Sequence, residues 1–273
     1  MAILKVENLY KVYEDGTQAL KDVSFEVEEG EFLVVIGLSG SGKSTLLRCI
    51  NRLVTPTSGH IWFNGVDITR IHGKRLRETR REIAMIFQQF NLVKRSKVIT
   101  NVISGRLGYM NPLWSLTGYV PPKVREDAMQ ALRQVGMPEK YNNRADALSG
   151  GQQQRVGIAR ALMQNPKLIL ADEPVASLDP VLAHSILDYL EKLNKERGLT
   201  VICSLHYLDL VQRYATRVIG LRQGEVVYRG SREDIQRITD KEFRQIYGEE
   251  AQRLGGGGIL GEVSTIEGAT THE

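Results

Sequence analysis

Cysteine is scarce in this sequence, and long uncharged apolar runs are lacking. Its 273 residues include only two cysteines, Cys49 and Cys203, each among apolar neighbours. These do not make a disulfide framework, so a reducing compartment is expected. No uncharged apolar stretch approaches the roughly 20 residues that a membrane helix needs, and the opening MAILKVENLYK carries charge too early for a secretory signal. We therefore expect that the chain does not span a membrane by itself.

A strong excess of one charge is also lacking. The formal net charge is +4 and the sequence pI is about 9.0, a mild imbalance that general solubility explains. The one basic cluster runs from Arg70 to Arg81 and is interrupted by Glu78. Such a cluster could meet nucleic acid or anionic lipid, but a solvated helix face is the favoured interpretation. We therefore expect no nucleic-acid partner.

Residues 37–45 read GLSGSGKST and fit the Gly-x-x-x-x-Gly-Lys-Ser pattern of a phosphate-binding loop. In such a loop backbone N–H groups surround the phosphates, Lys43 reaches the β and γ groups, and Ser44 offers a hydroxyl to Mg²⁺. The apolar run Phe32–Ile36 predicts a strand before the loop, and residues 44–53 predict a helix after it, so a plain glycine-rich turn is disfavoured. The loop residues predicted to bind the nucleotide are Gly37, Leu38, Ser39, Gly40, Ser41, Gly42, Lys43, Ser44 and Thr45.

The segment LILADE, residues 168–173, supplies two carboxylates at the end of an apolar run. Four apolar residues are typical of a parallel strand buried on both faces, and α/β sheets bind ligands at the carboxyl ends of such strands. We predict that Asp172 holds Mg²⁺ and that Glu173 orients or deprotonates the water that attacks the γ-phosphate. Alone this signal is weak, but together with the phosphate loop it indicates nucleotide hydrolysis.

The pattern of apolar residues divides the chain into three parts. Strands are predicted at residues 3–10, 23–27, 32–36 and 60–63. Helical periodicity then predicts an α-helical subdomain over about residues 91–165, inserted in the core. The core resumes with a strand at 168–171, a helix at 180–196, a strand at 200–204 and a hairpin at 218–230. We expect one α/β domain over residues 1–253, followed by a flexible glycine-rich tail over residues 254–273.

The string LSGGQQQR at residues 148–155 marks the start of an expected helix at residues 153–164. Ser149 and the glycine amides form an anion-ready helix start, and a bare N-cap would explain Ser-Gly-Gly alone. With the full string, the sequence resembles the ATP-binding cassette (ABC) family of ATPases. The resemblance implies that this string meets ATP held on a second subunit, so that two copies clamp two nucleotides. The residues implied to contact the partner subunit's ATP are Ser149, Gly150, Gly151, Gln152 and Asp179.

The resemblance covers about residues 3–247 and implies roles for further positions. Tyr13 corresponds to the aromatic residue that stacks on adenine, although a tyrosine near a turn is by itself more often simple packing. Gln88 corresponds to the glutamine that joins the Mg²⁺ shell, with Gln89 as the neighbouring alternative. His206 corresponds to the histidine that contacts the γ-phosphate.

The dimer-interface turn and the fold also follow from this resemblance. Asp179 belongs to the turn that crosses the dimer interface, where this chain has VASLD and the family more often has Ser-Ala-Leu-Asp. The catalytic residues implied are Glu173, His206 and Lys43, and the Mg²⁺ ligands are Ser44, Gln88 and Asp172. The implied fold is a P-loop, RecA-like α/β core with an N-terminal antiparallel β subdomain and the inserted helical subdomain.

Two longer stretches, residues 87–109 and 160–180, look like the ATP-binding subunits of phosphonate importers. The implied activity is an ATPase coupled to uptake of phosphonate across the cytoplasmic membrane, with ATP and Mg²⁺ as cofactors. The implied partners are a second copy, an integral membrane permease and an extracytoplasmic phosphonate-binding protein. The implied location is the cytoplasmic face of the inner membrane, reached through the permease. Phosphite or another small phosphorus oxyanion is the alternative cargo.

Two other function classes are less favoured. ABC ATPases that act on nucleic acid usually carry a long coiled-coil insertion or two cassettes in one chain, and neither is visible here. A small-molecule kinase with the same loop has no use for the LSGGQ string. The segment Tyr109–Val120, which contains Trp114, either docks against the permease or packs in the helical subdomain.

Overall fold

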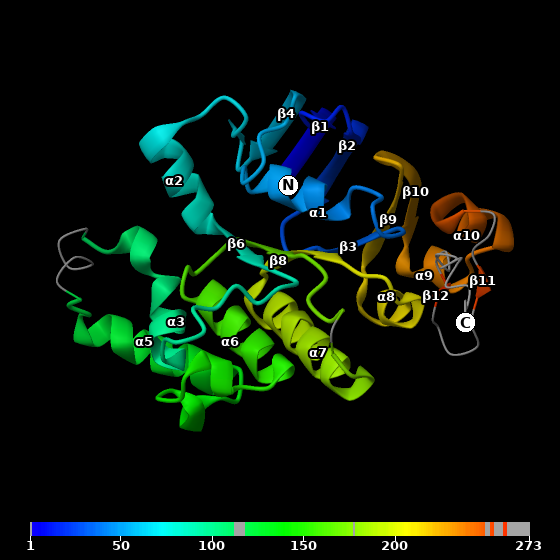
Figure 1. The fold of residues 1–273 in the computed structure, drawn as a ribbon. Coiled ribbons are helices and arrows are strands. Elements are labelled where there is room, and N and C mark those ends of the chain that lie inside the picture. The colour runs from blue at the N-terminus through cyan, green and yellow to red at the C-terminus, as the bar shows by residue number, and fades with distance from the viewer. Residues whose placement is uncertain (1, 112–117, 177, 249–251, 254–258, 261–273) are drawn as a thin grey trace, which may run out of the picture.

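The computed structural model describes residues 2–111, 118–176, 178–248, 252–253 and 259–260. Its helices and sheets form layers (Figure 1). A four-stranded sheet in the order β2-β1-β4-β5 lies on one side of a six-stranded sheet in the order β10-β9-β3-β8-β7-β6, and most helices lie on the other side. This arrangement confirms the predicted α/β class.

The four-stranded sheet is antiparallel throughout. Its strands are β1 (Ala2–Val12), β2 (Gln18–Glu28), β4 (Ser58–Phe63) and β5 (Val66–Asp67). In β1, Leu4 and Val6 are buried while Lys5 and Glu7 reach solvent, because only one face of the sheet meets the core. The sequence predicted these strands, although β1 and β2 are longer than expected.

The six-stranded sheet has a parallel centre and an antiparallel edge. Its strands are β3 (Phe32–Ile36), β6 (Ile83–Ile86), β7 (Leu168–Ala171), β8 (Thr200–Ser204), β9 (Arg217–Arg222) and β10 (Glu225–Ser231). Leu33 and Val35 pack toward α1 (Lys43–Ile50) and the antiparallel sheet, while Val34 and Ile36 pack toward the helices on the opposite face. Both faces are covered, which explains the continuous apolar runs.

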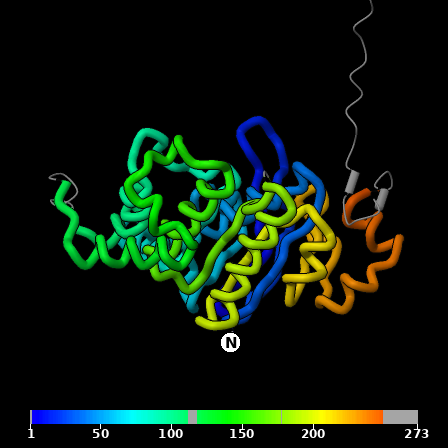
Figure 2. The backbone as a smooth tube through the Cα atoms, turned by 90° about the horizontal axis from the view of Figure 1, so that it is seen from below, coloured from blue at the N-terminus to red at the C-terminus, as the bar shows by residue number. Residues whose placement is uncertain are grey.

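The helical region between β6 and β7 lies at one end of the molecule (Figure 2). Its helices are α3 (Val98–Ser104), η1 (Leu107–Tyr109), α5 (Pro122–Gln134), η2 (Pro138–Lys140), η3 (Ala145–Ala147) and α6 (Gly150–Leu162). α6 begins at Gly150, three residues before the expected start, because Ser149 and Gln152 form a capping box there. Trp114 and its neighbours at residues 112–117 lie outside the described residues, so the docking hypothesis stays a prediction.

The described part of the chain after β7 forms further helices. These are α7 (Pro180–Arg197), α8 (Leu208–Tyr214), α9 (Arg232–Gln236) and α10 (Asp240–Tyr247). α9 and α10 lie at the end of the molecule opposite the helical region (Figure 2). Within the predicted tail, β12 (Ile259–Leu260) pairs with β11 (Gln252–Arg253), and the rest of residues 254–273 lies outside the described residues.

The basic cluster lies on and beside α2 (Gly73–Glu82), which buries none of its residues. This placement is the solvated helix face that the sequence favoured. Of the helices in the described ranges, none has the length and apolar character that crossing a membrane requires.

Candidate nucleotide-binding and hydrolysis site

The predicted phosphate loop connects the end of β3 to the start of α1. Gly37, Gly40 and Gly42 have φ angles of 144°, 77° and 106°, a region that favours glycine. A Cβ atom on Gly42 would lie 2.5 Å from the carbonyl oxygen of Ala19, so a larger residue cannot take its place without a shift. The hydroxyl of Ser41 is buried and has no hydrogen-bond partner among the described residues. The loop therefore passes close to β2 with its backbone N–H groups at the start of a helix, as phosphate binding requires.

Lys43 is held inside this loop. Its side chain is 3% exposed, and its Nζ donates hydrogen bonds of 2.8 Å to the carbonyl oxygens of Gly37 and Leu38. Nζ also lies 3.8 Å from Oε1 of Glu173. Burial lowers the pKa of Lys43 to about 8, against the opposing effect of the carboxylates of Glu173 and Asp172. The ammonium group is thus fixed at the loop before any phosphate is present.

Asp172 lies at the carboxyl end of β7, and its carboxylate contacts two other elements, α1 and β8. Its Oδ1 accepts a hydrogen bond of 2.7 Å from Ser44 Oγ and one of 3.4 Å from Ser204 Oγ. Its Oδ2 lies 3.6 Å from the guanidinium of Arg48. A carboxylate and a hydroxyl side by side are oxygen donors, which Mg²⁺ prefers. Ser44 and Asp172 therefore fit a Mg²⁺ site.

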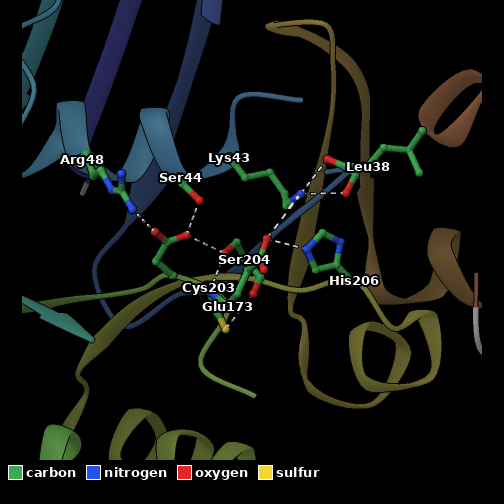
Figure 3. Close-up of polar contacts among 10 residues, drawn as sticks. Leu38, Lys43, Ser44, Arg48, Glu173, Cys203, Ser204 and His206 are labelled. Carbon is green, nitrogen blue, oxygen red and sulfur yellow. Dashed lines mark hydrogen bonds and ion pairs between the residues drawn. The ribbon is translucent and has the colours of Figure 1, made fainter. Parts of the chain in front are cut away.

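Glu173 follows Asp172 in a left-handed conformation, with φ of 47°. Its N–H donates a 2.8 Å hydrogen bond to Ser204 Oγ, and its Oε1 is bonded to Nε2 of His206 (Figure 3). The hydrogen bond from His206 lowers the pKa of Glu173 and outweighs burial, with further help from the charges of His206 and Lys43. The carboxylate is therefore ionised at neutral pH, as a general base must be.

A cavity of about 680 Å³ lies beside these groups, within the size range of ligand pockets. The predicted residues that line it are Tyr13, Ser39, Gly40, Gly42, Lys43, Ser44, Thr45, Gln88 and Glu173. Gln89, the alternative to Gln88, does not line it. Tyr13 is 37% exposed, and its hydroxyl lies 3.2 Å from Thr45 Oγ1. The structure thus brings Tyr13 and Gln88 to the phosphate loop from two different sheets. Tyr13 follows β1 of the four-stranded sheet, and Gln88 follows β6 of the six-stranded sheet.

The residues predicted to contact a partner's nucleotide lie apart from this cavity. The nucleotide cavity is lined by none of these five residues, which are Ser149, Gly150, Gly151, Gln152 and Asp179. Ser149 caps α6, and Asp179 caps α7 by accepting a 3.0 Å hydrogen bond from the N–H of Leu182. A Cβ atom on Gly151 would lie 1.8 Å from Leu182, so this glycine lets the starts of α6 and α7 pack closely. Ser177, in the same turn as Asp179, lies outside the described residues.

Sequence reasoning missed several residues of the site. The hydroxyl of Ser204 forms hydrogen bonds with both Asp172 and Glu173. Arg48 lies one helical turn after Ser44, with its guanidinium close to Asp172. A serine at the end of the apolar run TVICS was an available signal for Ser204. The cavity-lining residues that were not predicted as site residues are Thr17, Gln18, Ala19, Lys21 and Gln223.

A phosphate loop followed by two carboxylates at the end of a parallel strand defines a P-loop nucleotide hydrolase. The family model described as ABC transporter matches residues 20–176. The chain therefore belongs to the ABC transporter family of ATP-binding cassettes and is an ATPase subunit.

Curated relatives cover nearly the whole chain. The chain is 56% identical, over 92% of its length and 95% of the relative, to the phosphonates import ATP-binding protein PhnC of Bdellovibrio bacteriovorus. It is 52% identical, over 93% of its length and 99% of the relative, to the protein of the same name from Staphylococcus aureus.

Solved structures of cassettes share the fold. One is a dimeric ATP-binding cassette in a post-hydrolysis state bound to ADP and phosphate, with a TM-score of 0.75, 35% identity, and coverage of 84% of this chain and 98% of that one. Another is a nucleotide-free cassette from an ABC transporter, with a TM-score of 0.79, 32% identity, and coverage of 90% and 98%. These likenesses confirm the predicted ABC ATPase fold.

Proposed function

We propose that this chain is the ATP-hydrolysing subunit of an ABC importer that takes up phosphonate. The observation that carries the proposal is the 56% identity, across 92% of the chain, to a phosphonate import ATP-binding protein. The geometry supports the hydrolytic part, because the loop, the ionised carboxylate of Glu173 and a cavity of ligand size lie together. ATP is the substrate of the reaction, and Tyr13, which lines the cavity, is the residue that stacks on its adenine.

In this proposal Lys43 exchanges its two carbonyl partners for the β and γ phosphates when ATP binds. The loop N–H groups surround the phosphates, and Gly42 keeps the backbone close enough to do so. Ser44, Asp172 and Gln88 are the residues that would hold Mg²⁺, which would neutralise phosphate charge when bound. Until then Arg48, 3.6 Å from Oδ2 of Asp172, helps to orient that carboxylate.

Glu173 acts as the general base in the hydrolytic step. Its carboxylate accepts the proton of the attacking water, and Ser204 fixes its backbone so that the side chain meets His206. Before this step, as ATP fills the cavity, the imidazole ring of His206 moves from Glu173 to the γ-phosphate. Lys43 stabilises the charge that develops on the phosphate during the attack.

The site is completed by a second copy of the chain. Ser149 to Gln152 and Asp179 do not line their own chain's cavity, which agrees with a role opposite the nucleotide of a partner. Closure of two cassettes over two nucleotides excludes water, and reopening follows hydrolysis. An attached integral membrane permease would move with this cycle. Attachment to that permease would hold the chain at the cytoplasmic face of the membrane. An extracytoplasmic phosphonate-binding protein would deliver the cargo.

Replacement of the base tests the hydrolytic assignment. Glu173→Gln keeps the shape and the hydrogen-bonding atoms but cannot accept the proton, so ATP binding should persist while steady-state hydrolysis falls by about 10²-fold or more. ATP binding by fluorescence and phosphate release should be measured, with dimer formation followed by size-exclusion chromatography in ATP. Glu196→Gln, on the exposed face of α7, is the matched control. Hydrolysis by Glu173→Gln at the parental rate would show that another group is the base.

The cargo is tested in the assembled transporter. The chain, its permease and its binding protein in lipid should show faster ATP hydrolysis with alkylphosphonates than with phosphite, phosphate or no addition. Stimulation by phosphite alone would keep the mechanism and replace the cargo.

A further inference from the structure

The loop that carries Gln88 is fastened to α6. This Gln88 loop, residues 87–97, connects β6 to α3. Arg160, near the carboxyl end of α6, donates hydrogen bonds of 3.0 Å and 2.6 Å to the carbonyl oxygens of Phe90 and Asn91. The two carbonyl groups belong to consecutive residues, so the planar guanidinium binds them as a fork. The first of them lies two residues after Gln88, which lines the nucleotide cavity.

Phe90 also packs along α6. A Cβ atom on Gly150, at the start of the helix, would lie 3.7 Å from Cζ of the Phe90 ring. A Cβ atom on Gly157, about two turns further on, would lie 4.0 Å from the Phe90 carbonyl oxygen. The ring and the backbone of Phe90 therefore both lie against α6, and the guanidinium of Arg160 closes this contact.

A second anchor holds the Gln88 loop farther from Gln88. The side-chain amide of Asn101, on α3, accepts a 2.8 Å hydrogen bond from the N–H of Val93 and donates one of 3.2 Å to its carbonyl oxygen. Among the described residues, the hydrogen bonds to the backbone of residues 87–92 come from Arg160 alone. The part of the loop next to Gln88 thus depends on this one side chain.

The charge of Arg160 strengthens its hold on the two carbonyl groups. Burial lowers the pKa of Arg160, and no carboxylate charge acts against that effect. A guanidinium nevertheless stays protonated in proteins. Hydrogen bonds from a charged donor are roughly twice as strong as those between neutral groups. The fork is therefore a strong contact between α6 and the loop.

We propose that Arg160 is a positioning residue for ATP hydrolysis, which holds the Gln88 loop against α6 and so keeps Gln88 at the nucleotide cavity. The proposal rests on the proposed function of the site. Arg160 does not line the nucleotide cavity, so it acts through Gln88 rather than on ATP.

The test is Arg160→Met, which keeps an unbranched apolar stem and removes both hydrogen bonds. Steady-state hydrolysis by the full chain in the assembled transporter should lose about threefold to tenfold in kcat. The affinity for a fluorescent ATP analogue in EDTA should stay as in the parent. Without Mg²⁺ the nucleotide is held by Tyr13 and the phosphate loop, which this change leaves untouched.

Arg232→Met is the matched control. Arg232 also donates hydrogen bonds to the carbonyl oxygens of two consecutive residues, Tyr214 and Ala215. It lies on α9, at the end of the molecule opposite the helical region (Figure 2). Its replacement removes the same kind of fork and should leave kcat as in the parent.

The double variant Arg160→Met with Gln88→Ala separates positioning from a structural effect. Gln88→Ala alone should lower kcat at least as much as Arg160→Met. If Arg160 acts through Gln88, the double variant should have the kcat of Gln88→Ala. Additive losses would show that Arg160 acts by another route and would overturn the proposal. If Arg160→Met does not fold, Arg160→Gln, whose side chain is too short to reach the two carbonyl oxygens, takes its place with the same expected results.

The outcomes distinguish this proposal from the function on which it rests. A parental chain that does not hydrolyse ATP in the transporter would overturn both. A parent that hydrolyses ATP, a Glu173→Gln variant that does not, and an Arg160→Met variant with parental kcat would overturn the role of Arg160 alone. Equal losses of kcat in Arg160→Met and Arg232→Met would also overturn it.

Discussion

Ser204 fixes the position of the proposed base, and its removal is the sharpest test of the site's architecture. Its side chain is fully buried and accepts a 2.8 Å hydrogen bond from the N–H of Glu173. Glu173 sits at φ of 47°, a conformation that costs a non-glycine residue on the order of 1–3 kcal/mol and persists only where neighbours impose it. Ser204 is one of those neighbours, because it ties the backbone of Glu173 to β8.

Ser204→Ala removes the acceptor and leaves that N–H without a partner. A buried donor left unpaired costs about 1–3 kcal/mol, so the free energy of unfolding should fall by that amount. The strained backbone of Glu173 can then relax, which moves its carboxylate away from His206 and from Lys43, now 3.8 Å distant. We expect kcat for ATP hydrolysis to fall at least about tenfold, equivalent to about 1.4 kcal/mol. ATP affinity should change little, because the loop and Lys43 are untouched.

The assay pairs urea unfolding of the ligand-free chain with steady-state hydrolysis in the assembled transporter. Ser104→Ala is the control, since its hydroxyl donates a 2.7 Å hydrogen bond to a carbonyl at the end of α3, far along the chain from the site. An unfolding free energy within about 0.5 kcal/mol of the parent, together with parental kcat, would refute the argument that Ser204 holds Glu173 in place.

Two further predictions concern the loop. Because burial lowers the pKa of Lys43 from 10.5 to about 8, the unfolded chain binds one more proton than the folded chain between those values, so this residue makes the ligand-free protein more stable as pH rises from 8 toward 10.5. Unfolding of Lys43→Met across pH 7 to 10 should lack that rise, and an identical pH dependence in parent and variant would contradict the burial of the charged amine. Gly42→Ala places a Cβ atom 2.5 Å from the Ala19 carbonyl oxygen at a φ of 106°, so it should lose ATP binding and about 1–3 kcal/mol of stability, whereas Gly65→Ala, at φ of 73° in open space, incurs only the backbone cost. Equal losses in the two glycine variants, by urea unfolding and ATP titration, would show that the close approach to β2 is unimportant.

The local patterns of the sequence determined much of the site. The loop between Phe32–Ile36 and Lys43 is contiguous in the chain, so its glycine spacing, its lysine and the following helix appear together in one short string. The same holds for Leu168–Ala171, where four apolar residues predict a buried strand and place Asp172 and Glu173 at its end. The start of α6 was misjudged by three residues, because helix propensity alone does not show that Ser149 and Gln152 cap each other.

Other parts of the site were decided by the tertiary structure. Ser204 reaches Glu173 across 31 residues of sequence, because the neighbouring parallel strands β7 and β8 end at one edge of the sheet. Tyr13 reaches Thr45 across 32 residues, because the antiparallel sheet packs on α1. Periodicity reports which face of a strand is buried but not which strand lies next to it, so the order β3-β8-β7 is invisible along the chain. The sequence by itself determined the chemistry, since phosphate, magnesium and water each require particular residue types at fixed spacing. Only the folded sheet decided which serine steadies the base, because that contact depends on strand order.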